Sequence, residues 1–239
     1  MNLVLFEARE LAIPLPQEDR RAAHILTILR RRVGDTFDAG VVNGPRGKAT
    51  LAAIGETTLS LTFNGESAPA PIVPLTLIVG LPRPATARDI LREAATLGAA
   101  AIHFVATEKG EPSYGKSTLW SSGEWRQLLL TGAAQAFDTR IPEVSHGRSL
   151  VDTVAGLPEG SRRIALDNYE APARFGQLEF SKEVPVAVAI GPERGWSAVE
   201  RDKLRGSGFE LAHLGARVLR VETAAIAAMA IIRAKLGLM

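Results

Sequence analysis

VPVAVAIGPERGWSAVERDKLRGSGFELAHLGARVLRVETAAIAAMAII, residues 184–232, is the stretch that decides the fold. Two apolar runs within it, residues 184–190 and 210–214, have the composition of β-strands. Each run is followed by a glycine-bearing loop and then a helical pattern, the loops being residues 191–196 and 215–220. Because ligands of α/β proteins bind at the carboxyl ends of strands, this arrangement predicts a ligand site formed by the two loops.

Residues in and next to the two loops have side chains that could bind a ligand or take part in a reaction. Ser197 and Glu200 have the spacing of a capping box, which predicts that a helix begins directly after the first loop. The second loop delivers Arg217 and Arg220 just before an alanine-rich helix that carries Glu222. Two readings stay open for these three residues: a structural ion network, or a catalytic group beside a bound ligand. The first loop is likewise either a tight turn or a backbone shaped to approach a ligand closely.

The rest of the second half alternates between strand and helix patterns. Residues 75–81, 99–106 and 162–166 are predicted strands, and residues 84–97 and 119–137 are predicted helices. Such alternation is typical of an α/β domain with a mostly parallel sheet and helices on both faces.

The N-terminal part has a different pattern. A strand is predicted over residues 2–8, a helix over 17–33, and short strands over 36–42, 49–54 and 58–63, with a turn at 43–47. This predicts a small β-barrel-like domain over residues 1–67. A proline-rich linker, residues 68–74, then leads to the second domain, residues 75–239.

Composition excludes several classes of protein. The 239 residues contain no cysteine, which excludes disulfides and thiolate catalysis. The four histidines are scattered without ligand spacing, so no metal site is expected, and no apolar run is long enough to span a membrane. Neither a signal peptide nor a GxGxxG dinucleotide motif is recognised, and a cytoplasmic location is expected. Because the net charge is only +2, any nucleic-acid binding must come from local patches.

One such patch follows the N-terminal helical pattern. His24 lies within it, and Arg30, Arg31 and Arg32 end it. These residues are either a solvated helix face or an edge that contacts phosphates.

The motifs resemble one known family. Ile190-Gly191-Pro192-Glu193-x-Gly195-x-Ser197 and Leu214-Gly215-x-Arg217-Val218-Leu219-Arg220-x-Glu222 are similar to the C-terminal motifs of the RsmE-type ribosomal RNA methyltransferases, members of the SPOUT superfamily. His24-Ile25-x-x-Ile28-Leu29-Arg30 resembles part of that family's PUA-like RNA-binding domain. The resemblance covers nearly the whole chain.

The resemblance implies a homodimer in which a PUA-like β-barrel precedes a trefoil-knotted α/β domain. It implies that S-adenosylmethionine is the methyl donor and that the substrate is N3 of a uridine in 16S rRNA of the small ribosomal subunit. The donor would be bound by Leu166, Ile190, Gly191, Pro192, Glu193, Gly195, Leu214, Gly215, Val218 and Leu219. RNA would be bound by His24, Arg30, Arg31, Arg32, Arg194 and Trp196.

The chemistry assigns roles to the second loop. N3 of uracil must lose its proton before it attacks a methyl group, and the resulting negative charge spreads onto O2 and O4. A fixed guanidinium stabilises such charge as an oxyanion donor does. Arg220 is expected in this role, Arg217 is expected as a second catalytic or phosphate-binding residue, and Glu222 is expected to orient an arginine.

The chain also departs from the family pattern on the substrate side. Thr96 replaces a usual glutamate, residues 134–138 replace a polar set, and Arg194 replaces a glycine. Arg194 and Trp196 are therefore interpreted either as new RNA-stacking groups or as plain surface replacements. The alternatives to the predicted activity are a paralogue acting on another RNA, a non-catalytic RNA-binding protein, and an α/β enzyme of small-molecule metabolism.

Overall fold

The computed structural model describes residues 3–69 and 72–239. Contacts between residues divide these into two compact units. The first unit contains the described residues up to 69 together with Ala133–Ile141, and the second contains Ile72–Gly132 and Pro142–Met239. Residue 2 of the first predicted strand and residues 70 and 71 of the predicted linker lie outside the described residues.

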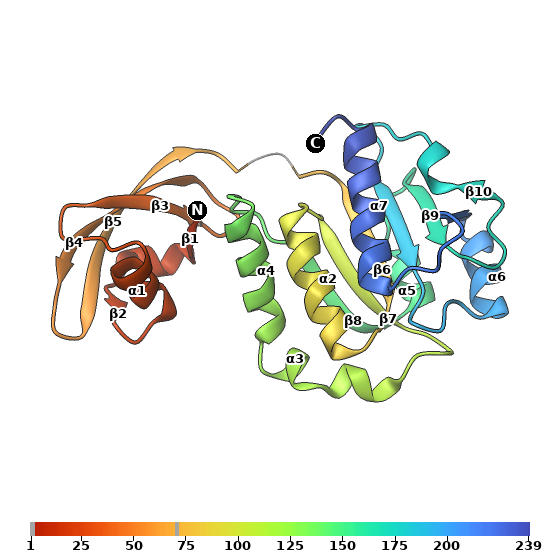
Figure 1. Cartoon of the computed structure of the whole chain (residues 1–239), viewed down its shortest axis with the longest axis horizontal. Helices are drawn as coiled ribbons and strands as arrows, with labels where there is room; N and C mark the ends of the chain where they lie inside the picture. Colours follow the sequence, from red (N-terminus) through yellow and green to blue (C-terminus); the bar gives the residue numbers. More distant parts are fainter. Residues whose placement is uncertain (1–2, 70–71) are drawn as a thin grey trace. The chain divides into compact units, whose positions relative to one another are not determined.

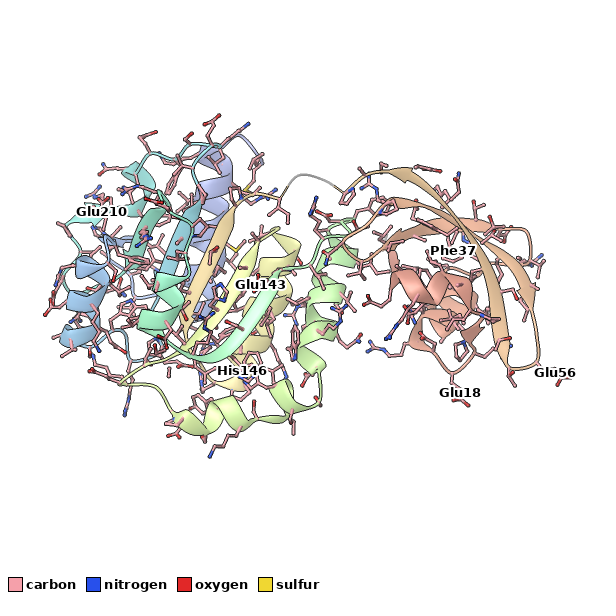
Figure 2. The ribbon with its side chains drawn as sticks, turned by 180° about the vertical axis from the view of Figure 1, so that it is seen from behind. Glu18, Phe37, Glu56, Glu143, His146 and Glu210 are labelled. Carbon is pink, nitrogen blue, oxygen red and sulfur yellow. The ribbon has the colours of Figure 1, made fainter. Side chains whose placement is uncertain are left out.

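The first unit is a curled, five-stranded mixed sheet in the order β1-β3-β4-β5-β2. Its strands are β1 (Val4–Phe6), β2 (Leu15–Pro16), β3 (Thr36–Val41), β4 (Arg46–Ile54) and β5 (Thr58–Ser67). β1 pairs with β3 in parallel and the other pairs are antiparallel. Phe37 of β3, labelled in Figure 2, is buried in the core with Phe6, Ile25 and Leu51. A 3₁₀ turn, η1 (Ala8–Ala12), joins β1 to β2.

The helix of the first unit is shorter than the sequence predicts. It consists of α1 (Arg20–Ala23), whose N-cap Asp19 accepts a hydrogen bond from a backbone N–H, and a π-helical turn, η2 (His24–Ile28). Arg30 has a φ of 52°, in the left-handed region that ends a helix. The prediction of a helix to residue 33 is therefore wrong at its end, and Arg30, Arg31 and Arg32 follow the helix instead of continuing it.

Residues 133–141 belong to the first unit through specific bonds. The Thr139 carbonyl accepts the N–H of Asn43 at 2.8 Å. Arg46 donates to the Phe137 carbonyl at 2.8 Å, and its guanidinium lies 4.9 Å from the Phe137 ring centroid. Phe137, in the stretch that departs from the family pattern, therefore packs against Arg46 at the start of β4, and Thr139 just after that stretch binds the turn between β3 and β4.

The second unit is built on a seven-stranded sheet in the order β10-β12-β9-β11-β6-β7-β8. All of its strand pairs are parallel. The strands are β6 (Leu75–Gly80), β7 (Ala101–Ala106), β8 (Glu143–Ser149), β9 (Arg162–Leu166), β10 (Ala173–Arg174), β11 (Val186–Ile190) and β12 (Glu210–His213). The predicted parallel α/β fold is confirmed, with β8 and β10 as strands that the sequence did not indicate.

Helices cover both faces of this sheet. They are α2 (Pro84–Thr96), α3 (Thr118–Ser121), α4 (Glu124–Gln135), α5 (Leu150–Ala155), α6 (Ala198–Gly206) and α7 (Val221–Lys235), with 3₁₀ turns η3 (Pro112–Lys116) and η4 (Phe175–Gln177). α2 and α7 lie side by side (Figure 1), and Arg233 of α7 donates to the Leu97 carbonyl at 2.9 Å. Side chains of α5 and α6 form a buried cluster with the sheet. The helix predicted over residues 119–137 is interrupted at Gly123, which has a φ of 76°.

Thr96, a departure from the family pattern, has a packing role. Its hydroxyl donates to the Arg92 carbonyl at 3.0 Å and lies 3.2 Å from the Gly132 carbonyl of α4. A Cβ on Gly132 would lie 2.2 Å from the Arg92 carbonyl oxygen, so the two helices approach closely here. Thr96 therefore fastens α2 to α4.

Candidate functional site

Strand order brings four loops to one edge of the sheet. β12, β9, β11 and β6 are consecutive neighbours, and Ile190 of β11 lies opposite Leu166 of β9 and Val79 of β6. Because the strands are parallel, the loops that follow them meet at the same edge. They enclose a pocket of about 460 Å³. Its wall is formed by Arg83, Thr86, Leu166, Asp167, Asn168, Tyr169, Ile190, Gly191, Pro192, Glu193, Arg194, Gly195, Leu214, Val218, Leu219, Arg220, Val221, Glu222 and Ala224.

The loop after β11 is compact because of its glycines. Gly195 has a φ of 67°, and its N–H donates to the Pro192 carbonyl at 2.7 Å. A Cβ on Gly191 would lie 3.0 Å from the Gly195 backbone. The capping box is confirmed: Ser197 N–H donates to the Glu200 carboxylate at 2.8 Å, and Glu200 N–H donates to the Ser197 hydroxyl at 3.1 Å. The loop is thus held at both ends.

Two carboxylates join this loop to its neighbours. Glu193 accepts the backbone N–H of Arg83, the N-cap residue of α2, at 2.9 Å. Buried Glu200 uses its other oxygen to accept the N–H of Glu108 at 2.9 Å, and Lys109 donates to the Trp196 carbonyl at 2.9 Å. The loops after β6, β7 and β11 therefore form one connected structure around the pocket.

Gly80, the last residue of β6, lies so close to the loop after β11 that we expect a side chain there to be harmful. A Cβ at that position would lie 2.5 Å from Pro192 Cδ and 2.7 Å from Pro192 N. Because both atoms belong to the ring and backbone of a proline, the clash can be relieved only by moving the main chain. We expect Gly80→Ala to weaken ligand binding in the pocket and to destabilise the fold by about 1–3 kcal/mol, as overpacking does. Urea unfolding and ligand titration measure the two effects. Gly206→Ala, where a Cβ meets open space, is the control; equal stability of both variants would contradict the prediction.

A buried ion pair supports the pocket wall after β9. Asp167 accepts the N–H groups of Tyr169 and Glu170 at 2.8 and 2.6 Å and pairs with Arg201 of α6 at 2.9 Å. The two paired side chains are 2% and 8% exposed. Burial by itself raises the pKa of the Asp167 carboxyl, but the hydrogen bonds from Arg201 and the backbone outweigh it and lower that pKa below its ordinary value.

The catalytic candidates lie at the start of α7. Arg220 is the N-cap residue of the helix, and its side chain, 83% exposed, lines the pocket. Its guanidinium is 4.0 Å from the Glu222 carboxylate, which is half-buried in the same wall. Arg217 is exposed on the same loop and stands outside the wall that the described residues form.

The structure brings together nearly all the residues predicted to bind the donor. Only Gly215 lies apart from the wall among them; it lines an adjoining pocket of about 800 Å³ that shares Asn168, Leu214 and Val218. Arg194 lies exposed at the same wall. His24, Arg30, Arg31 and Arg32 lie in the first unit.

Trp196 contradicts its predicted role. Its indole is fully buried in the cluster beneath α5 and α6, so it presents no face to an RNA base. The neighbouring turn directs this side chain into the core because the helix that begins at Ala198 packs over the sheet. Trp196 is a core residue.

Sequence reasoning missed seven wall residues: Val221, Ala224, Arg83, Thr86, Asp167, Asn168 and Tyr169. The last three come directly after a buried strand, and a polar run at such a place is a usable signal. Arg83 and Thr86 gave no signal, because their position depends on β6 lying beside β11.

Across residues 3–69 and 72–239, no group of three or more histidine or acidic side chains is placed to hold a metal ion. Within the same residues, every helix is too short or too polar to cross a membrane.

Comparison with known proteins agrees with this architecture. Residues 68–233 match the family described as RNA methyltransferase domain. Ribosomal RNA small subunit methyltransferase E of Treponema pallidum (strain Nichols) is 35% identical over 243 residues, which cover 98% of this chain and 91% of the relative.

Two solved structures share the fold. Ribosomal RNA small subunit methyltransferase E from Neisseria gonorrhoeae, bound to S-adenosyl methionine, superposes with a TM-score of 0.77 at 19% identity and covers 99% of this chain and 98% of its own. A probable rRNA-methyltransferase from Porphyromonas gingivalis superposes with a TM-score of 0.83 at 20% identity, covering 98% and 99%. With a family match over most of its length and a relative 35% identical along nearly all of it, the chain belongs to the RNA methyltransferase family, in the group of ribosomal RNA small subunit methyltransferase E.

Proposed function

We propose that this protein transfers a methyl group from S-adenosylmethionine to N3 of a uridine in small-subunit rRNA. The observation that carries the proposal is the pocket at the carboxyl edge of the parallel sheet with the Arg220 guanidinium at its wall. The name of the Treponema pallidum relative supports the substrate class, and the Neisseria gonorrhoeae structure supports the donor.

The pocket suits a nucleoside donor. Its volume, about 460 Å³, falls within the range of about 300–1,000 Å³ that is typical of small-molecule sites. Buried Ile190 and Val221 give it an apolar floor, and the backbone turns tightly at Gly191 and Gly195. When bound, S-adenosylmethionine supplies an electrophilic methyl group on a sulfonium.

The protein's contribution to the reaction is positioning and charge. Uracil N3 becomes nucleophilic when it loses its proton, and the charge that develops on O2 and O4 requires a fixed donor. Arg220 lies at the pocket wall and provides five N–H groups on a planar fork. Glu222 orients that guanidinium from the first turn of α7, and Arg217 on the exposed loop contacts RNA phosphate.

The proposal includes a domain organisation. Residues 1–67 form a PUA-like RNA-binding domain, residues 68–74 a linker, and residues 75–239 a SPOUT methyltransferase domain with a trefoil knot, except that Ala133–Ile141 belongs to the first compact unit. Two chains form a homodimer in the cytoplasm. The curled sheet of the first unit and the parallel sheet of the second support this organisation.

The test is transfer of labelled methyl groups from S-adenosylmethionine to small ribosomal subunits, naked 16S rRNA and tRNA. We expect label in small-subunit rRNA, recovered after digestion as N3-methyluridine. Label in tRNA alone, or on another base atom, would contradict the proposed substrate. Donor binding without transfer to any RNA would favour a non-catalytic RNA-binding protein.

The arginines after the first-unit helix should contribute to RNA affinity. Each phosphate contact adds about 0.7 to the slope of log affinity against log salt for single-stranded RNA. We therefore expect combined alanine replacement of Arg30, Arg31 and Arg32 to weaken binding of 16S rRNA and lower that slope by about 2. Fluorescence anisotropy across a salt series measures it. The double variant Arg9→Ala/Arg20→Ala, which removes two exposed arginines of the same unit, is the control. An unchanged slope in the triple variant would indicate that these three arginines face solvent and do not contact RNA phosphates.

A further inference from the structure

Tyr169 is an aromatic residue that the structure holds at the mouth of the pocket. It is 76% exposed although it lines the pocket wall. The pocket floor, by contrast, is made of buried residues such as Ile190 and Val221. A tyrosine kept in solvent at a binding site offers a large planar surface to a partner, and exposed aromatic groups at such sites are typical of recognition surfaces.

Several contacts fix this side chain in place. The Tyr169 N–H donates to the buried Asp167 carboxylate at 2.8 Å. The guanidinium carbon of Arg201 lies 5.3 Å from the centroid of the tyrosine ring, in cation–π contact. The ring also lies near the loop after β11, since a Cβ built on Gly195 would lie 3.7 Å from Tyr169 Cε2. The ring therefore lies against Arg201 of α6 and close to that loop.

Arg201 is itself held rigidly. Its side chain is 8% exposed, and it pairs with Asp167 at 2.9 Å and with Glu170 at 3.0 Å. A buried arginine whose position is set by two carboxylates leaves its ring partner little freedom to rotate away. Fewer freely rotating groups at a binding surface lower the entropic cost of association.

We infer that Tyr169 stacks on an unpaired base of the RNA substrate, one that flanks the methylated nucleotide, and that Arg201 is the positioning residue for its ring. This rests on the proposed function, because the uridine itself must reach the donor beside Arg220 while Tyr169 lies at the exposed mouth. RNA recognition commonly uses unstacked bases on aromatic side chains. The stacking role that was one of the two readings of Trp196 is therefore taken by Tyr169, and exposed Arg194 lines the same wall.

The test compares Tyr169→Leu with the unaltered protein in two measurements. Stacking of a base on an aromatic side chain contributes about 1–3 kcal/mol, so we expect a loss of RNA affinity of roughly 5- to 150-fold. Anisotropy with labelled 16S rRNA fragments gives the affinity, and steady-state methylation should show a raised KM for RNA with kcat little changed. Calorimetry should give an S-adenosylmethionine affinity within about twofold of the unaltered protein.

Three further variants sharpen the test. Tyr169→Phe keeps the ring and is expected to recover most of the affinity lost in Tyr169→Leu. Arg201→Lys keeps a positive charge beside Asp167 but loses the planar group beside the ring. It is expected to raise the KM for RNA and to add little when combined with Tyr169→Leu. Val199→Ala, which shortens an exposed side chain of α6, is the matched control.

Equal RNA affinity of Tyr169→Leu and the unaltered protein would overturn the inference, as would an equal loss of donor affinity, which would place Tyr169 in the donor pocket. These results are distinguishable from failure of the proposed function. If the unaltered protein methylates no RNA but binds it, and Tyr169→Leu binds it more weakly, the stacking role stands without the activity. If the unaltered protein methylates rRNA and Tyr169→Leu does so with the same KM, the activity stands without the stacking role.

Discussion

Arg220→Ala is expected to reduce methyl transfer by about 10²–10³-fold, the cost of removing one donor aimed at developing charge. The affinity for S-adenosylmethionine should change little, because the guanidinium is exposed at the wall while the apolar floor and the glycine loop are the parts proposed to contact the donor. Single-turnover methylation of 16S rRNA measures the rate, and calorimetry measures donor affinity.

Two variants accompany it. Arg220→Lys keeps the charge without the planar fork and should fall between the alanine variant and the unaltered protein. Arg148→Ala, which removes an exposed arginine of β8 in the same unit, should leave the rate unchanged. A parallel loss of donor affinity in Arg220→Ala would assign Arg220 to donor binding, and an unchanged rate would remove it from the mechanism.

Asp167→Ala should have the largest effect on stability. The substitution leaves the buried Arg201 guanidinium without its principal partner, since only the partly exposed Glu170 remains beside it. Breaking a buried pair by removing one member costs about 3–5 kcal/mol. Urea unfolding measures the loss. The control is Asp202→Ala, whose exposed pair with Arg205 is of the kind that contributes less than about 1 kcal/mol. Similar losses in the two variants would contradict the argument.

The same ion pair gives a pH dependence with a definite sign. Because the pKa of Asp167 is lowered in the folded state, its contribution to the free energy of unfolding is fully present above its unfolded pKa. The unfolded pKa is about 3.9, so the contribution declines as pH falls below about 4 and through the lower folded value. Asp167→Asn should therefore show a shallower loss of stability between pH 5 and pH 2, roughly the range over which this carboxyl titrates. If the free energy of unfolding of Asp167→Asn depended on pH as that of the unaltered protein does, Asp167 would not contribute to acid unfolding.

Local patterns predicted most of the second unit's elements. The runs that became β6 and β11 are mostly apolar along their length, as strands buried on both faces must be, and β9 is apolar over its last three residues, after Arg162 and Arg163. β8, with the sequence EVSHGRS, escaped prediction because it is an edge strand with mostly polar, exposed residues. It is a strand because its backbone pairs with β7, a contact between distant parts of the chain that no local pattern encodes.

In the candidate site, too, some residues could be predicted from local sequence and others depend on contacts between distant parts of the chain. The loops after β11 and β12 were predicted because glycine, proline and arginine follow apolar runs directly. Tyr169 and Arg83 complete the pocket only because β9 and β6 are the neighbours of β11. Local sequence also did not show on which side of its loop Trp196 lies. Burial of that indole depends on α5 and α6 packing over the same face of the sheet.

The contribution of Ala133–Ile141 to the first unit has a consequence for folding of the chain during its synthesis. Domains generally fold in order as a nascent chain is synthesised, the N-terminal one first. Here Arg46 and Gly44, where β3 turns into β4, find their partners Phe137 and Thr139 only after 91 and 95 further residues have been synthesised. The first strands to be translated must therefore wait for a segment made much later before their unit is complete.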